Sequence, residues 1–402
     1  MVTGVQDLNI EQFRIRNYRV LMDVTFSKIS RLTVLCGPNG SGKSTVFDVF
    51  AFLHTAFTTN LRQAWDERNR MSEIRSRGAD GPVGFEIKYR TGLDGRSRLA
   101  TYTLEIDEEN GGPIVRTEKL QWTTAPGQGR PRTILGFTDG QGQVYDELSG
   151  ETTSEQLVHR DQLAVSALGA LSRHPRVTAL RDFISGWYLS YLNVSNLRAT
   201  PISGPATRLS QSGDNLANVL QYLEEQHPDR LEKIFNILAS RVPRLERVLT
   251  ERLPDGRLLL RLKDEPFDQP VLSRFASDGT LKLLAYLTVL HDPDPPAVVG
   301  IEEPENQLHP ALLPVLAEEA REASASSQLL VTTHSPEFVD ALHPPELWAI
   351  RRGDDGFAIV ERASDMLIIV MEMVKAGATL GDLWRERYLG ENPLAPALGM
   401  VG

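Results

Sequence analysis

The sequence predicts an α/β protein with a mostly parallel central sheet, an antiparallel β subdomain and an inserted helical lid. Three observations lead to this prediction. Strand patterns alternate with helical patterns from residue 280 onward, which is typical of a largely parallel sheet. Short β-rich runs between residues 83 and 145 are separated by turns such as Asn110-Gly111-Gly112, which favours an antiparallel meander. From about residue 153 to residue 243, apolar residues recur at helical spacing instead.

These patterns divide the chain into four segments. Residues 1–150 contain a hairpin, a buried strand, a helix and the meander, and residues 151–243 form the helical lid. Residues 244–362 contain the second α/β stretch, and residues 363–402 form a helical tail. The sequence has no internal repeat and no heptad run long enough for a coiled-coil arm, which argues against a long tethering machine.

The first segment predicts a strand, a turn and a helix in direct succession. β-forming residues at 13–16 and 21–26 predict a hairpin, which leads into a buried strand at 31–36. A glycine-rich turn follows, and an apolar helix is expected at 45–57.

The lid and the third segment also divide into elements. Helices are expected at 156–171, 177–192 and 216–238, the last one broken at His227-Pro228. Two strands flank the turn Pro254-Asp255-Gly256. The elements expected after them are helices at 280–290 and 310–323 and strands at 297–301, 328–332, 347–351 and 357–361.

Composition excludes several classes of protein. The 402 residues carry a net charge of −10, so any contact with DNA would need a local patch of Lys and Arg. Cys36 is the single cysteine, which excludes an internal disulfide and a cysteine-based zinc site. The N-terminus lacks a signal pattern, and the longest apolar run, at 366–371, is too short to cross a bilayer. We therefore expect a cytoplasmic protein without a membrane segment.

A loop of the form G-x-x-x-x-G-K-[ST] follows the strand at 31–36. Its residues are Gly37, Pro38, Asn39, Gly40, Ser41, Gly42, Lys43 and Ser44, and Thr45 follows in the helix. The glycines let backbone N–H groups converge on phosphates, and the helix N-terminus adds partial positive charge. Lys43 would reach the β- and γ-phosphates, and the Ser44 hydroxyl would bind Mg²⁺. The alternative, a turn with a surface lysine, does not explain why the motif lies between a strand and a helix.

Two carboxylates end the apolar strand at 297–301. Glu302 occupies the position where such strands usually carry Asp, and it would hold the Mg²⁺ shell, through water because its side chain is longer. Glu303 would orient or deprotonate the attacking water. An acidic strand end that only avoids burial is the alternative, and the P-loop upstream argues against it.

Two further segments extend the pattern. His334 follows the strand at 328–332, and ligands of open α/β sheets bind at the carboxyl ends of the strands, so His334 is a candidate γ-phosphate sensor. Ser277, Asp278 and Gly279 precede the helix at 280–290, where backbone N–H groups attract phosphate. Taken singly, His334 could be structural and Ser277 or Asp278 could be a helix cap. The order of the motifs favours the functional interpretation.

This order resembles the ABC-class ATPases related to RecF and the OLD family, a group of AAA family ATPases with SMC-like heads. The resemblance spans about residues 10–360. It rests on the P-loop, on Ser-Asp-Gly-Thr at 277–280, on Glu-Glu-Pro-Glu-Asn-Gln-Leu-His-Pro at 302–310 and on Thr-Thr-His-Ser-Pro at 332–336, with weaker support at 15–19 and 213–217. It implies that residues 1–150 and 244–362 are the two parts of an ATPase head.

The resemblance also implies that ATP joins two heads in a homodimer. Ser277 and Gly279 would be the signature that touches the γ-phosphate bound by a second subunit. Residues 306–309 would correspond to the D-loop and His334 to the switch histidine. The signature differs from the Leu-Ser-Gly-Gly-Gln form of transporters, and no residue can be assigned to the Q-loop.

Within this group we expect an ATP-hydrolysing switch that acts in bacterial anti-phage defence or in DNA repair. The residues after His334 contain no paired carboxylates suited to two metals, so nuclease or toxin activity would come from a separate effector protein. A nucleotide-binding subunit of a transporter and a non-hydrolysing ATP-binding scaffold are the alternatives.

Overall fold

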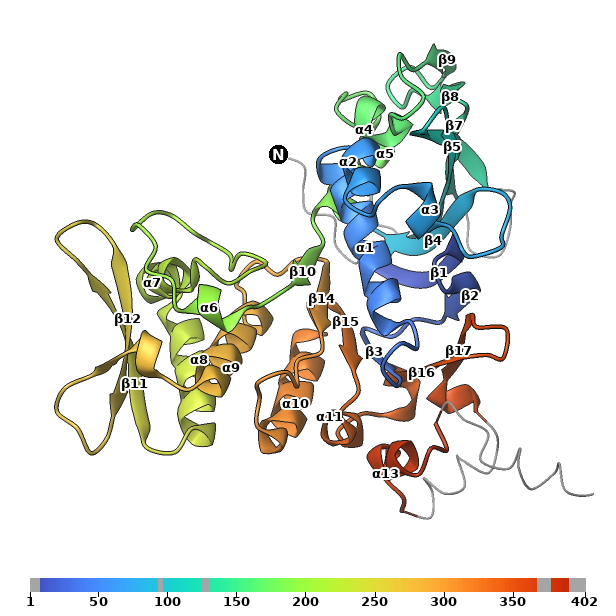
Figure 1. The fold of residues 1–402 in the computed structure, drawn as a ribbon. Helices are drawn as coiled ribbons and strands as arrows, with labels where there is room; N and C mark the ends of the chain where they lie inside the picture. The colour runs from blue at the N-terminus through green and yellow to red at the C-terminus, as the bar shows by residue number, and fades with distance from the viewer. Residues whose placement is uncertain (1–7, 93–96, 124–130, 367–376, 390–402) are drawn as a thin grey trace, which may run out of the picture.

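The computed structural model describes residues 8–92, 97–123, 131–366 and 377–389. A central sheet lies between two lobes, one built on a large antiparallel sheet and the other on helices with a small sheet at the far end (Figure 1). Most of the tail predicted at 363–402 lies outside the described residues.

The first lobe contains an eight-stranded antiparallel sheet in the order β2-β1-β4-β5-β6-β7-β8-β9. Its strands are β1 (Asn9–Tyr18), β2 (Leu21–Ser27), β4 (Val83–Thr91), β5 (Arg98–Glu109), β6 (Gly112–Trp122), β7 (Arg132–Thr138), β8 (Gln141–Tyr145) and β9 (Thr152–Gln156). Side chains along β5 alternate between buried and partly exposed positions, as expected when one face of a sheet covers a core. The predicted hairpin and meander are confirmed.

The central sheet has six strands in the order β10-β14-β15-β3-β16-β17. They are β10 (Tyr188–Ser190), β14 (Val298–Glu302), β15 (Gln328–Thr333), β3 (Leu32–Cys36), β16 (Leu347–Arg352) and β17 (Ala358–Arg362). Neighbours from β10 to β16 are parallel, and β17 is antiparallel at the edge. Strands β3 and β15 are buried along their whole length, because layers cover both faces. The predicted mostly parallel sheet is confirmed.

Helix α1 (Lys43–Thr58) packs against both sheets. Phe50 on this helix contacts Phe13 of β1 edge-to-face, with ring centroids 5.1 Å apart, and Trp187 at the same distance. The short helices of this lobe are α2 (Leu61–Asp66), α3 (Met71–Ile74), α4 (Ala164–Leu168) and α5 (Pro175–Ser185). Contacts on both sides fix α1, and therefore the loop before it.

The second lobe lies on the other side of the central sheet (Figure 1). Its helices are α6 (Val194–Leu197), α7 (Leu216–Gln226) and α8 (Pro228–Arg241), and its strands are β11 (Leu245–Arg252), β12 (Leu258–Asp264) and β13 (Val271–Leu272). The break at His227-Pro228 is confirmed, since proline cannot continue the hydrogen bonding of α7 and instead starts α8. Helix α9 (Asp278–Leu290) is almost fully buried and leads from this lobe back to β14.

In the described part of the chain, three further α-helices follow β14. They are α10 (Leu313–Ala323), which a 3₁₀ turn precedes at Pro310–Leu312, α11 (Pro336–Asp340) and α13 (Leu380–Arg385). Helix α13 packs against α11, and the Gly381 N–H donates to the Asp340 carboxylate at 2.9 Å.

The helices predicted at 156–171 and 177–192 are wrong in extent. Strand β9 occupies the start of the first range, and only α4 is helical there. In the second range α5 ends at Ser185, and the buried residues Tyr188–Ser190 form β10 against β14. The spacing of apolar residues does not by itself distinguish a short buried strand from a buried helix. Residues 188–190 form a strand because β14 is available as a pairing partner.

Candidate active site

The glycine-rich loop joins the end of β3 to the first turn of α1. Gly40 and Gly42 have φ angles of 78° and 116°, which favour glycine over residues with a Cβ atom. Gly37 is required for a different reason, because a Cβ there would lie 2.3 Å from the backbone oxygen of Ile350. The loop therefore needs glycine at three positions, two for backbone conformation and one for close packing.

Lys43 is buried at the base of this loop, with 3% of its surface exposed. Its ammonium group donates to the backbone oxygens of Gly37 at 2.7 Å and Pro38 at 3.2 Å. The lysine therefore folds back across its own loop, and these two carbonyl oxygens hold its charge there. A phosphate group on the loop would compete with these two carbonyl oxygens for the ammonium.

Strand register brings the other predicted residues to the same edge of the sheet. Glu302 at the end of β14 pairs with Thr332 of β15, which in turn pairs with Leu35 of β3. His334 directly follows β15, and the P-loop directly follows β3. Because all three strands are parallel, their carboxyl ends share one edge.

The Ser44 hydroxyl lies near enough to the Glu302 carboxyl to act on its pKa, although the two residues are distant in the sequence. Burial raises the pKa of the Glu302 carboxyl, and the nearby carboxylates of Glu303 and Asp48 raise it further, while the Ser44 hydroxyl opposes the shift. Glu303 and Asp48 therefore add negative charge around the Glu302 carboxyl, and a bound cation would offset that charge.

These groups fit Mg²⁺ in chemical type, since Mg²⁺ prefers oxygen ligands. Within the described ranges, no group of three or more His, Cys, Asp or Glu side chains is arranged to hold a metal. A protein site with only Ser44 and Glu302 needs water and substrate phosphates to complete its shell, which is the usual arrangement for Mg²⁺ in phosphate-binding enzymes.

Glu303 has a left-handed backbone, with φ of 42°, which is uncommon for a residue other than glycine. Its N–H donates to the Thr332 backbone oxygen at 2.9 Å and lies 3.2 Å from the Thr332 hydroxyl. The Asn306 amide donates to the Glu303 carboxylate at 3.2 Å. Hydrogen bonds from both sides hold this conformation, which turns the side chain away from the strand axis while leaving it 26% exposed.

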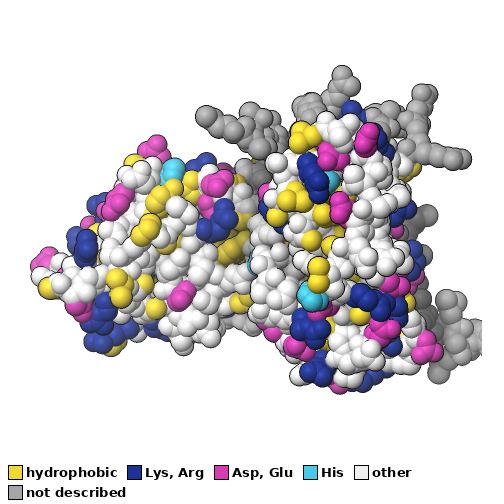
Figure 2. Space-filling view, turned by 90° about the horizontal axis from the view of Figure 1, so that it is seen from above, with side chains coloured by type: hydrophobic (Ala, Val, Ile, Leu, Met, Phe, Trp, Pro, Cys, Tyr) yellow, Lys and Arg dark blue, Asp and Glu magenta, His cyan; other side chains and the backbone are white. Residues whose placement is uncertain are grey.

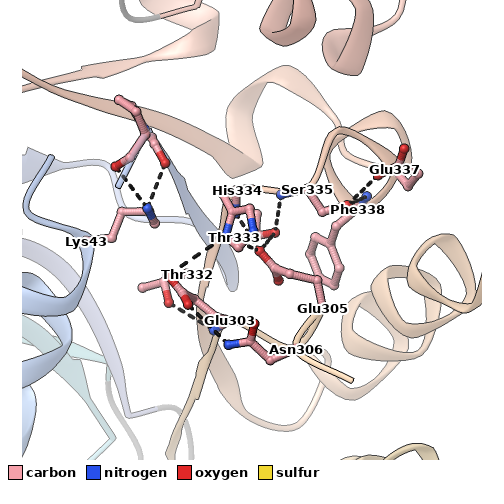
Figure 3. Close-up of polar contacts among 12 residues, drawn as sticks. Lys43, Glu303, Glu305, Asn306, Thr332, Thr333, His334, Ser335, Glu337 and Phe338 are labelled. Atoms are coloured by element: carbon pink, nitrogen blue, oxygen red, sulfur yellow. Dashed lines mark hydrogen bonds and ion pairs between the residues drawn. The ribbon is translucent and has the colours of Figure 1, made fainter. Parts of the chain in front are cut away.

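A carboxylate that the sequence analysis did not single out lies beneath His334. Glu305 is 8% exposed, and its Oε1 atom lies 3.0 Å from Nδ1 of His334, whereas Glu303 lies 3.9 Å from the same nitrogen. Figure 3 shows Glu305 directed at His334 and Asn306 directed at Glu303. The position of Glu305, three residues after Glu302, was the only hint in the sequence that it belongs to the site. The fold shows that its partner is His334.

Ser277, Asp278 and Gly279 lie at the N-terminus of α9. The Ser277 hydroxyl accepts from the Thr280 N–H at 3.1 Å, so Ser277 caps the helix, and Arg198 forms an ion pair with Asp278 at 2.6 Å. A Cβ on Gly279 would lie 3.1 Å from the backbone oxygen of Gln307, so this end packs on the loop after β14. Among the described residues, no hydrogen bond or ion pair joins 277–279 to the P-loop of the same chain.

Helix α13 reaches the same edge of the sheet. The indole N–H of Trp384 donates to the backbone oxygen of His334 at 3.2 Å. Trp384 and Pro38 of the P-loop also line one hollow, together with Arg351. The described part of the tail thus contacts the loop that carries the histidine.

A protein-family model described as "AAA domain, putative AbiEii toxin, Type IV TA system" matches residues 32–340. The chain belongs to this family. Across the described residues of this AbiEii-type AAA ATPase, no helix combines the length and apolarity needed to cross a bilayer.

Solved structures support the fold of this AbiEii-type AAA ATPase. It is similar to an SMC head bound to the C-winged helix domain of ScpA, with a TM-score of 0.55, 14% identity, and coverage of 88% of this chain and 97% of that chain. It is also similar to an Smc head with an extended coiled coil bound to the C-terminal domain of ScpA from Pyrococcus furiosus, with a TM-score of 0.52, 13% identity, and coverage of 92% and 99%. The AbiEii-type AAA ATPase therefore has the ABC-class fold of SMC heads.

A curated protein is similar to part of the chain. The chromosome partition protein Smc of Thermoplasma acidophilum is 30% identical over 100 residues, which are 25% of this chain and 8% of that protein. This AbiEii-type AAA ATPase thus matches only a small part of that relative's length. Family and fold together make the chain a P-loop ATPase with an SMC-like head.

Proposed function

We propose that this protein is a molecular switch that hydrolyses ATP to ADP and phosphate in a head-to-head dimer. The observation that carries the proposal is the register of β14, β15 and β3, whose ends share one sheet edge and bring Glu302 near Ser44 of the P-loop. Glu303 and His334 lie at the same sheet edge, 3.9 Å apart. A phosphate-binding loop, a metal-binding pair and a base-and-histidine pair are the components that phosphoryl transfer to water requires.

In the proposed reaction, the loop residues Gly37 to Ser44 bind the triphosphate, and Lys43 exchanges its carbonyl partners for the β- and γ-phosphate oxygens. Ser44 and Glu302 would hold Mg²⁺, which would supply positive charge against the developing negative charge. Glu303 accepts a proton from the attacking water or orients it, and it is exposed enough to reach the γ-phosphate. His334 contacts the γ-phosphate and reports whether it is present.

We assign the nucleoside to a hollow beside the P-loop that is lined by Arg19, Val20, Arg68 and Phe357. Its wall touches the loop, since a Cβ on Gly42 would lie 2.9 Å from a methyl group of Val20. Arginine side chains and a phenylalanine ring suit a ribose and a planar base. The triphosphate would then run from this hollow toward Lys43.

The dimer follows from the position of the signature. Ser277 and Gly279 present the N-terminus of α9, and in Figure 1 this helix lies in the second lobe, away from the junction of β3 and α1. Helix N-termini bind phosphate, so a second chain is needed to bring these groups to a γ-phosphate. ATP would join the two heads, and hydrolysis would release them.

We propose a biological role in anti-phage defence, as the sensor and activator of a separate effector protein, or in DNA repair. The family's description as a toxin of a toxin–antitoxin system supports defence, and the two SMC heads are each recorded with a ScpA domain bound. On the face shown in Figure 2, basic and acidic side chains are interspersed, so charge on that face does not favour DNA over protein as partner.

The test uses two variants that disable opposite halves of the proposed shared site. Lys43→Ala removes the phosphate ligand, and Ser277→Arg blocks the signature, so each variant alone should release no phosphate from ATP. Mixed in equal amounts, random pairing leaves one intact site in about half of the dimers, and activity should recover to roughly a quarter of the wild-type value. No recovery would exclude a site shared across subunits, and no activity in the wild type would exclude hydrolysis and favour a scaffold.

A further inference from the structure

Glu305 is a buried carboxylate whose hydrogen bonds converge on the residue that follows β15. Its Oε1 atom accepts from the Thr333 hydroxyl at 2.9 Å and from the His334 backbone N–H at 2.6 Å. The same oxygen lies 3.0 Å from Nδ1 of the His334 ring. Figure 3 shows these contacts meeting on one side of the imidazole.

A buried carboxylate is costly unless hydrogen bonds or charges compensate for its lost hydration. Among the described residues, Oε2 of Glu305 has no hydrogen-bond partner, while Oε1 accepts two hydrogen bonds and lies 3.0 Å from Nδ1 of His334. A carboxylate that served only to hold the loop after β14 would be expected to divide its bonds among that loop's own N–H groups. The geometry instead directs Glu305 at His334.

We propose that Glu305 is a positioning residue that fixes the orientation and tautomer of His334, so that the ring presents Nε2 to the bound nucleotide. The role of Nε2 in binding nucleotide rests on the proposed function. The contact between Glu305 and His334 does not depend on that function. To donate to the carboxylate, Nδ1 must carry a hydrogen, and in a neutral ring Nε2 is then the free nitrogen. The bond from the His334 backbone N–H to the same oxygen holds the main chain of His334 beside Glu305.

The arrangement also separates the tasks of the two neighbouring glutamates. Glu303 is 26% exposed and farther from Nδ1, at 3.9 Å, so its carboxylate stays available for water. Glu305 is buried and bound to the ring, so it does not reach substrate. One carboxylate thus acts on the reacting water and the other acts through the histidine, as in sites where a second residue orients a histidine that contacts substrate.

The kinetic test is a double-mutant cycle between Glu305 and His334. Glu305→Ala should lower kcat about 10- to 100-fold and change KM for ATP less than about threefold. Glu305→Gln should recover most of kcat, because an amide oxygen can accept from the same donors. Glu305→Ala added to His334→Ala should cause no further loss. Losses that multiply in the double variant, or an unchanged kcat in Glu305→Ala, would overturn the proposal.

Glu337→Ala is the matched control. Glu337 is a carboxylate of the same segment that accepts from the Ser335 hydroxyl at 2.7 Å and ion-pairs with Arg385. The Glu337→Ala variant should keep kcat near the wild-type value. If Glu305→Ala does not fold, Glu305→Met replaces it, because methionine has a similar length but no carboxylate to accept hydrogen bonds. The kcat of Glu305→Met is then compared with that of Glu305→Gln.

A second readout does not depend on activity. Long-range ¹H–¹⁵N spectra of protein labelled with ¹⁵N-histidine distinguish the two neutral tautomers, and His334→Ala identifies the signal. The wild type should show hydrogen on Nδ1, and Glu305→Ala should shift the ring to hydrogen on Nε2, the form a free imidazole favours. A wild type with the Nε2–H form would overturn the proposal even if ATP is hydrolysed, whereas an inactive wild type with the Nδ1–H form would reject only the proposed function.

Discussion

Ser44 in the first turn of α1 lies near enough to Glu302, the last residue of β14, to lower the pKa of its carboxyl, and this proximity links the P-loop to β14. Strand β15 lies between β14 and β3 in the sheet, so Ser44 and Glu302 approach each other across the end of β15. This proximity brings a hydroxyl and a carboxylate to the place where a phosphate-bound Mg²⁺ would need protein ligands.

Glu302→Gln should separate metal binding from stability. Burial and nearby carboxylates raise the pKa of Glu302, so replacing it with a neutral amide should leave the free energy of unfolding unchanged or increase it. The same change should increase the Mg²⁺ concentration needed for half-maximal phosphate release by about tenfold. Titration of ATPase activity with Mg²⁺ checks this, with Glu361→Gln on β17 as an exposed control, and an unchanged midpoint would remove Glu302 from the metal site.

Glu303→Gln should bind ATP but hydrolyse it at least about 100-fold more slowly, because the amide cannot accept a proton from water. The variant should accumulate as a dimer in ATP and Mg²⁺, since hydrolysis releases the heads. Phosphate release and mass photometry measure the two effects, and Asn306→Asp tests the neighbour that donates to this carboxylate. Wild-type turnover in Glu303→Gln would reject the assignment of the base.

Glu118 should make stability depend on pH. This carboxylate of β6 accepts from the Tyr102 hydroxyl and from the N–H groups of Ala164 and Val165 at the start of α4, and burial raises its pKa to about 7. The folded state therefore holds a proton that the unfolded state has already lost. The group's contribution is complete below the unfolded pKa of about 4.5 and is lost as pH rises through about 7, a change of about 3 kcal/mol at most.

The measurement is urea unfolding of the wild type and of Glu118→Gln at pH 5 and pH 8. The wild type should lose more stability than the variant on going to pH 8, because the amide has no proton to lose. Glu86→Gln on β4, which is partly exposed, should follow the wild type. Equal losses in all three proteins would show that Glu118 titrates in its ordinary range.

Trp384→Phe should lower ATPase activity, because Trp384 in the tail contacts the His334 backbone. The substitution keeps a ring but removes the N–H that donates to the His334 backbone oxygen, a bond whose loss costs about 1 kcal/mol. We expect kcat to fall about two- to tenfold, with ATP affinity retained. Tyr388→Phe is the control on the same segment, and an unaffected kcat in Trp384→Phe would mean that α13 does not influence the histidine.

The sequence alone predicts those elements and site residues for which the local pattern and the chemistry agree. The P-loop at 37–44 could be placed because its glycines and its position between a strand and a helix have one physical explanation. Glu302 and His334 could be expected together because parallel strands end at one edge. The antiparallel sheet followed from the turns that separate its strands.

Other features depend on distant contacts that no local pattern reports. The apolar spacing predicts helix where strand β10 lies, because three buried residues carry no period and the partner strand β14 lies far along the chain. Glu305 could be read as one more acid in an acidic run until β15 placed His334 against it. The contact of Trp384 with the His334 backbone depends on the docking of α13 on α11, which sequence spacing does not encode.

The most direct test of a single nucleotide site is a crystal structure of Glu303→Gln with ATP and Mg²⁺. The account predicts the triphosphate on residues 37–44, with Lys43 on the γ-phosphate and Mg²⁺ near Ser44 and Glu302. His334 and a second chain's Ser277 should face the same γ-phosphate. A nucleotide bound elsewhere, or bound here with Glu302 and His334 turned away from it, would contradict the account.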